Sequence, residues 1–138
     1  MNRWHPHVTV ATVIERDGLF LLVEEDTEQG LVYNQPAGHL ERGETLQQAA
    51  IRETLEETAW QVELIGLLGQ ALYTSPNNDL TYQRTTFVAQ AVSHDSTLEL
   101  DRGILRATWM SRDELLAESD KMRSPLVLAS IDQYLNGP

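Results

Sequence analysis

Cysteine is absent from this sequence, and basic residues are scarce. Without thiols the chain can form no disulfide bond, no thiolate zinc site and no cysteine nucleophile. Its 10 Lys and Arg side chains stand against 21 Asp and Glu side chains, which gives a formal net charge of −11 at pH 7. Such a surface repels a nucleic-acid backbone, so we expect no nucleic-acid partner, and a polyanionic substrate would need cations at its binding site.

Long apolar runs are also missing. No run approaches the roughly 20 residues that span a bilayer, and the segment 1–9 lacks the apolar block of a signal peptide. We therefore expect a cytoplasmic protein without membrane contact. A length of 138 residues with 41% apolar side chains fits one domain over residues 1–138 with an ordinary core, present as a monomer or a homodimer.

Strand-like segments rich in β-branched and apolar residues recur along the chain. They are Val8–Ile14, Leu19–Glu25, Val32–Pro36, Val62–Tyr73, Tyr82–Val92 and Ala107–Met110. An Asp-Gly turn separates the first two, and a turn-rich stretch at 75–79 separates the fourth from the fifth, which predicts two β-hairpins.

Helical signals occupy the remaining segments. Residues Glu44–Thr58 contain no Pro or Gly and predict one helix of about four turns. The sequence Ser111-Arg112-Asp113-Glu114 matches a capping box that opens a helix through Glu118, and Ser124-Pro125 predicts a last helix to Leu135. The mixture of strands with a few helices favours an α/β sandwich.

The helix over Glu44–Thr58 carries Glu53, Glu56 and Glu57 at spacings of i, i+3 and i+4, so the three carboxylates share one sector. Apolar side chains of the preceding turns project into that sector, which indicates that the carboxylates face the protein body. A solvated acidic stripe is the alternative interpretation. Clustered like charges at a partly desolvated surface favour a hard cation, Mg²⁺ or Mn²⁺, and the loop from Gly38 can approach it with backbone carbonyls.

The string from Gly38 to Trp60, GHLERGETLQQAAIRETLEETAW, resembles the Nudix box, in which Gly, Glu and an Arg-Glu-apolar-x-Glu-Glu-x-Gly-apolar run recur at fixed spacing. The positions in register are Gly38, Glu44, Arg52, Glu53, Glu56, Glu57 and Trp60. Two positions depart from the pattern, because Thr54 stands where an aliphatic residue is usual and Ala59 replaces a glycine. The segment Trp109–Leu115 also fits the family, whose fold is an α/β/α sandwich with a mixed central sheet.

This resemblance implies a role for each matching residue. Glu53 and Glu57 would be the main metal ligands, Glu56 a ligand directly or through water, and the Gly38 carbonyl a further one. Arg52 and Glu44 would complete the catalytic set by orienting the cluster through salt bridges. The implied metal is Mg²⁺, with Mn²⁺ as a possible substitute.

Many family members add a carboxylate from a late loop, and the aligned residue in this chain is Gly103. Asp101 and Glu99 are close enough in sequence to substitute, and we expect Asp101 to be the metal ligand. Two solvated loop acids are the alternative interpretation.

Three residues outside the box are candidates for substrate binding. Arg84, in a predicted strand, could contact a phosphate or face solvent. Tyr33 and Tyr73 could stack on a base, although aromatic residues beside strands also serve as packing groups.

The leading functional hypothesis is a metal-dependent hydrolase of phosphoanhydride bonds that acts on a small-molecule nucleotide or pyrophosphate. The segments 34–41 and 123–127 resemble a subgroup of bacterial phosphatases that act on nucleoside tri- and diphosphates and on thiamine-type pyrimidine pyrophosphates. One alternative keeps the site but assigns an ADP-sugar or dinucleoside-polyphosphate substrate. Another is a catalytically silent Nudix domain that senses a nucleotide.

Overall fold

Two neighbouring strands share a turn and then separate into different halves of one sheet. The computed structural model describes residues 3–137. In it, β1 (His7–Arg16) and β2 (Leu19–Thr27) pair only beside their turn, where Glu15 lies opposite Phe20 and Arg16 opposite Leu19. The first predicted hairpin is therefore confirmed at its turn but not along its length.

The central sheet is mixed, as predicted. Its order is β3 (Gly30–Asn34), β2, β1, β6 (Thr81–His94) and β5 (Trp60–Thr74), with β4 (Ala37–His39) paired to β1 and β7 (Ile104–Ser111) paired to β2. β1 and β6 run parallel, from His7 opposite Tyr82 to Ile14 opposite Ala89, and the other named strands pair antiparallel. β5 and β6 pair along their full length, which confirms the second predicted hairpin.

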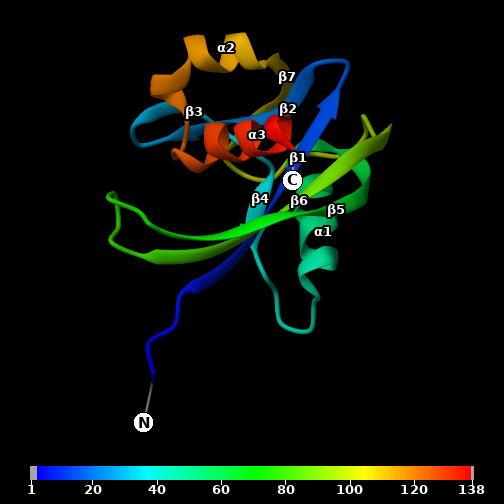
Figure 1. Ribbon diagram of the computed structural model, residues 1–138. Helices are drawn as coiled ribbons and strands as arrows, with labels where there is room; N and C mark the ends of the chain where they lie inside the picture. Colours follow the sequence, from blue (N-terminus) through cyan, green and yellow to red (C-terminus); the bar gives the residue numbers. More distant parts are fainter. Residues whose placement is uncertain (1–2, 138) are drawn as a thin grey trace.

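Helices cover both faces of the sheet. Figure 1 shows α2 (Arg112–Ala117) and α3 (Leu126–Asn136) together on one side, and α1 (Leu46–Thr58) on the other. A 3₁₀ turn, Ser119–Lys121, lies between α2 and α3 along the chain. This is the α/β/α sandwich that the sequence predicts. None of the helices in the described part of the chain has the length and apolar character that crossing a bilayer requires.

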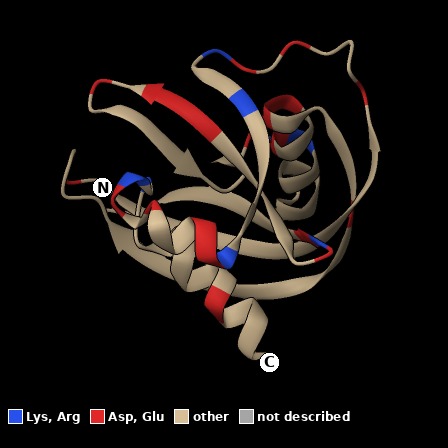
Figure 2. Ribbon diagram, turned by 90° about the horizontal axis from the view of Figure 1, so that it is seen from above, with Lys and Arg blue, Asp and Glu red and all other residues tan. Residues whose placement is uncertain are grey.

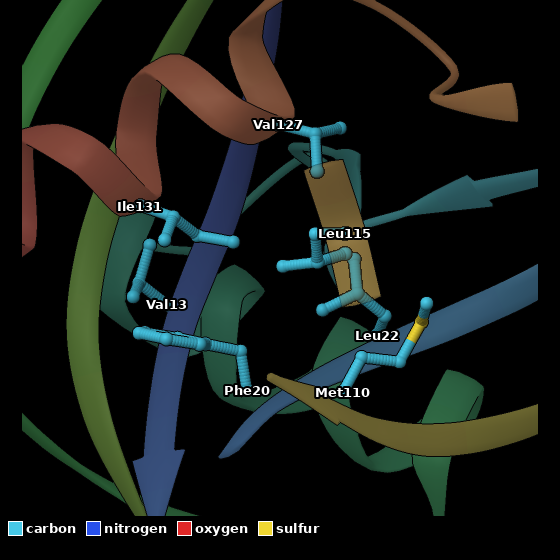
Figure 3. Close-up of a cluster of buried hydrophobic side chains, with 7 residues drawn as sticks. All are labelled: Val13, Phe20, Leu22, Met110, Leu115, Val127 and Ile131. Carbon is cyan, nitrogen blue, oxygen red and sulfur yellow. The ribbon is translucent and has the colours of Figure 1, made fainter. Parts of the chain in front are cut away.

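Alternating side chains of β1 and β2 divide the core between the two helical layers. Figure 3 shows the layer under α2 and α3, where Val127 and Ile131 of α3 and Leu115 of α2 face strand residues; the whole cluster is Val13, Phe20, Leu22, Met110, Leu115, Val127 and Ile131. On the opposite face, Val10 packs with Ala49, Ala50 and Phe87. The small alanines let α1 lie close to the sheet, and this closeness brings its carboxylates to the neighbouring β4.

Helix α1 begins at Leu46, two residues after the predicted start. Thr45 is the N-cap: its side chain accepts a hydrogen bond from the Gln48 backbone N–H, and the Gln48 side chain accepts one from the Thr45 N–H. Glu44 is left outside the helix, where its Oε1 accepts from the Glu41 N–H at 2.9 Å. The cap thus frees Glu44 to reach the site from a loop.

Thr54, at the position where the Nudix pattern has an aliphatic residue, is fully buried. Its Oγ1 donates to the Ala50 carbonyl at 2.7 Å and lies 3.0 Å from Oγ1 of Thr12, which is buried in β1. Because the Thr54 proton goes to Ala50, Thr12 must be the donor to Thr54. The hydroxyl that Thr54 introduces at this position is therefore hydrogen-bonded to the Thr12 hydroxyl across the helix–sheet interface.

Replacing Thr54 with valine is expected to lower the free energy of unfolding by about 1–3 kcal/mol, because the buried Thr12 hydroxyl loses its acceptor. The double variant Thr54→Val/Thr12→Val should regain most of that loss, since two apolar groups then meet. Urea unfolding of the two single variants and the double variant measures the coupling. Strictly additive losses would contradict the proposed donor–acceptor pair.

Candidate active site

Three carboxylates from two distant segments meet beside α1, whose ribbon carries acidic and basic residues together (Figure 2). Glu53 and Glu56 of α1 and Asp101 of the loop before β7 each present an oxygen, and these atoms all lie within 4.8 Å of one another. The loop is fixed to the helix, because the Asp101 N–H donates to the Glu56 carbonyl at 3.0 Å. Of the two loop acids considered from sequence, Asp101 joins the cluster, while Glu99 is not part of it among the described residues.

Arg52 connects this cluster to Glu44. Its Nε and Nη2 donate to the two carboxylate oxygens of Glu44 at 2.6 and 2.9 Å, and its Nη1 donates to Glu53 at 2.7 Å and to Glu56 at 2.6 Å. The bond from Arg52 holds the pKa of Glu44 below its usual value. A planar guanidinium that forks to three acids fixes their positions as a point charge could not.

Gly38 is required because there is no room for a side chain at this position, and not because its backbone adopts a conformation that only glycine tolerates. A Cβ built on Gly38 would lie 2.1 Å from the Cδ atom of Glu53, closer than any non-bonded contact allows. The sequence predicted a glycine that bares its carbonyl for a cation. In the structure its missing side chain also makes room for the Glu53 carboxylate against β4.

Glu57 lies deeper than the other acids of the helix. Its Oε1 accepts a hydrogen bond from the Ala37 N–H at 2.8 Å, and burial raises its pKa to about 8. Burial also raises the pKa of Glu53 and, in its loop, of Asp101. Desolvated acids with raised pKa values are the donor set that a divalent cation would stabilise in their ionised form.

In the absence of metal, stability is expected to fall as the pH rises from about 5 to about 8.5. The pKa of Glu57 in the folded protein, about 8, exceeds the 4.5 that is usual for a glutamate side chain. The protonated acid therefore stabilises the fold fully below pH 4.5, and this contribution is lost as the pH passes 8. Melting in EDTA across this range should show the decline, and Glu57→Gln should flatten it. Parallel curves for the two proteins would contradict the assignment.

A cavity of about 300 Å³ opens beside Glu57, whereas Glu53, Glu56 and Asp101 are not among its lining residues. Gly38 and Glu57 form one of its walls, and Tyr73 and Arg84, both predicted substrate contacts, line it too. The other lining residues are Thr9, Glu25, Asn34, Ala37, His39, Ser75, Asn77, Asn78, Tyr82, Arg123, Ser124 and Leu126. The tip of the β5–β6 hairpin thus supplies uncharged polar groups opposite the acidic helix.

Tyr33, the third residue predicted to contact substrate, is not among the residues that line this cavity. Tyr33 packs beside the core cluster under α2 and α3, and its backbone carbonyl accepts from the Arg123 N–H at 2.7 Å. Burial and the nearby Glu24 carboxylate raise the pKa of the Tyr33 hydroxyl. It is one of the packing aromatics that the sequence interpretation kept as an alternative.

Arg84 faces the cavity from β6, and sequence analysis missed the residue that holds it. Its Nη2 donates to Oε1 of Gln35 at 2.8 Å, and burial lowers the pKa of Arg84 to about 10. Gln35 lies in the segment 34–41 that carries the subgroup resemblance, which was the available signal. Arg123, which pairs with Glu25 in the cavity wall, lies in the other such segment, 123–127.

Comparisons with known proteins agree with this geometry. The profile of the NUDIX domain family matches residues 3–130. Phosphatase NudJ of Escherichia coli strain K12 is 39% identical over 132 residues, which cover 96% of this chain and 85% of that protein. The solved NUDIX hydrolase from Nitrosomonas europaea is 47% identical, covers 96% of this chain and 90% of its own, and superimposes with a TM-score of 0.94.

A more distant neighbour shows the fold alone. The NUDIX domain of Shewanella oneidensis NrtR, solved in complex with ADP ribose, is 19% identical with a TM-score of 0.72 over 97% of this chain and 89% of its own. The fold and the glutamate helix define a Nudix enzyme. The chain belongs to the Nudix hydrolase family, and within it the predicted resemblance to the bacterial phosphatase NudJ is confirmed.

Proposed function

We propose that this chain hydrolyses phosphoanhydride bonds in nucleoside di- and triphosphates or thiamine-type pyrimidine pyrophosphates, with Mg²⁺ as its metal and Mn²⁺ as a substitute. The observation that carries the proposal is the cluster of Glu53, Glu56 and Asp101 oxygens within 4.8 Å. On the same helix as Glu53 and Glu56, Glu57 lines a cavity together with Arg84. All donors are carboxylates, the ligands that Mg²⁺ prefers. The likeness to phosphatase NudJ supports this substrate class.

Each residue of the site has a definite task in this proposal. Glu53, Glu56 and Asp101 would hold the metal, with Glu57 and the Gly38 carbonyl as further ligands. Bound there, a divalent cation would neutralise the phosphoryl oxygens and lower the pKa of the attacking water. The remaining catalytic residues, Arg52 and Glu44, keep the acids in place.

On the other side of the reacting phosphate, the cavity wall would bind the substrate. Arg84 would contact a phosphate group, and Tyr73 would stack on the heterocycle. One domain over the whole chain, a cytoplasmic location and a monomer or homodimer stay predictions from the sequence.

Activity is expected to vanish in excess EDTA and to return with Mg²⁺ or Mn²⁺, because clustered carboxylates repel an anionic substrate unless a cation neutralises them. The measurement is turnover before chelation, after chelation and after metal is restored. Full turnover in EDTA would contradict the mechanism, while Mg²⁺-induced thermal stabilisation without turnover on any substrate would favour a nucleotide sensor.

A substrate panel with Mg²⁺ tests the proposed class. The first group of substrates contains purine and pyrimidine nucleoside di- and triphosphates and thiamine pyrophosphate, and the second contains ADP-ribose and a dinucleoside polyphosphate. The release of orthophosphate and of pyrophosphate is measured separately for each substrate. The proposal expects the first group to be turned over with the larger kcat/KM. A clear preference for ADP-ribose or the dinucleotide would replace it with the alternative substrate class.

A further inference from the structure

Gln35 is a buried amide placed between a strand end and the cavity. It follows β3, its residue exposure is 1%, and its Oε1 accepts the hydrogen bond from Nη2 of Arg84. A guanidinium has no acceptor, so the amide must present its oxygen to Arg84. Nε2 of Gln35 and Nε of Arg84 are the buried side-chain nitrogens without a hydrogen-bond partner in the described chain.

The hydrogen-bond partner of Arg84 is uncharged, and this distinguishes it from four other arginines that are held by carboxylates. Arg52, Arg106, Arg112 and Arg123 each form an ion pair with a carboxylate within 4.0 Å, whereas no such pair involves Arg84 in residues 3–137. The acids Glu57 and Glu25 act on Arg84 only through longer-range attraction. Its charge is therefore oriented but not neutralised, and its buried Nε has no hydrogen-bond partner in the described chain.

An oriented cation that lines a cavity and lacks a counter-ion suits an anionic ligand group. We propose that Gln35 is a positioning residue, which holds the Arg84 guanidinium toward the cavity through a neutral acceptor and so keeps its charge available for a phosphate group of the substrate. This inference rests on the proposed function. The competing explanation is that Gln35 only fills space and satisfies a buried arginine.

Gln35→Glu separates the two explanations, because it preserves the size and the hydrogen bond but neutralises Arg84. We expect KM for the best substrate of the panel to rise at least about tenfold while kcat changes less than about threefold, since binding is lost equally in ground and transition states. The thermal stabilisation by inorganic pyrophosphate with Mg²⁺ should shrink in parallel. A space-filling role predicts an unchanged KM and an unchanged pyrophosphate shift, and that result would overturn the proposal.

Gln35→Met tests whether the effect passes through Arg84. In the wild-type background it removes the acceptor of the Arg84 hydrogen bond and should raise KM. In an Arg84→Gln background it should leave KM unchanged. Equal effects in both backgrounds would overturn the positioning role. If melting shows that Gln35→Met does not fold, Gln35→Glu decides alone.

Absence of turnover by the wild type on every substrate would instead refute the proposed function, so the two failures are distinguishable.

Discussion

Replacing Gly38 with alanine is expected to lower turnover at saturating Mg²⁺ by at least about a hundredfold. The new Cβ would lie 2.1 Å from Cδ and 2.2 Å from Oε2 of Glu53. Glu53 would have to turn away, although Nη1 of Arg52 holds its other oxygen at 2.7 Å. The cluster with Glu56 and Asp101 would then lose a member, and metal affinity should fall with turnover.

Gly66→Ala is the matched control for this steric effect. A Cβ at Gly66, in β5, meets no atom within 4 Å, and neither Gly66 nor Gly38 has a positive φ. Both variants therefore add one methyl group to an extended backbone. Turnover and the Mg²⁺-induced shift in melting temperature should be lost in Gly38→Ala and kept in Gly66→Ala. Normal turnover of Gly38→Ala would show that Glu53 is not needed in its observed position.

Glu57→Gln is expected to cost at least about a hundredfold in turnover while the fold is kept. The amide is nearly isosteric, and its Oε1 can still accept the Ala37 N–H that Glu57 binds at 2.8 Å. What it removes is the negative charge that a hard cation requires. Because the pKa of Glu57 is raised to about 8, the metal-free variant should melt at a higher temperature than the wild type at alkaline pH.

The control for Glu57→Gln is Glu63→Gln, which makes the same chemical change at an exposed position of β5. Turnover and the Mg²⁺-induced shift in melting temperature are measured on the wild type and both variants. If Glu57→Gln retained near-full turnover and an unchanged metal shift, the assignment of Glu57 to the site would be wrong.

The glutamate helix is the part of the site that the sequence predicts best, because helical periodicity is local. Glu53, Glu56 and Glu57 fall on one side of α1 whatever the rest of the chain does. The capping box at Ser111 is likewise local and is confirmed, with the Ser111 side chain accepting from the Glu114 N–H and Glu114 accepting from the Ser111 N–H.

Features that depend on contacts between distant segments could not be predicted from local sequence patterns. Nothing local distinguishes Asp101 from Glu99; the difference is that the Asp101 N–H reaches the Glu56 carbonyl. Tyr33 is adjacent in sequence to cavity residue Asn34, yet alternation along β3 turns it toward the core. The bond from Arg84 to Gln35 joins residues 49 positions apart, beyond any sequence periodicity.

The separation of β1 from β2 has a consequence for how the chain acquires its catalytic centre. β1 leaves its neighbour after the turn and pairs instead with β6, so that His7 lies opposite Tyr82, 75 positions later. A contact of this range forms only after a large loop has closed, so we expect it to be a late step in folding. β4, which carries Gly38, is held in the sheet by β1. A nascent chain can therefore form the glutamate helix early, but it acquires an ordered acidic cluster only when its first strand docks on its sixth.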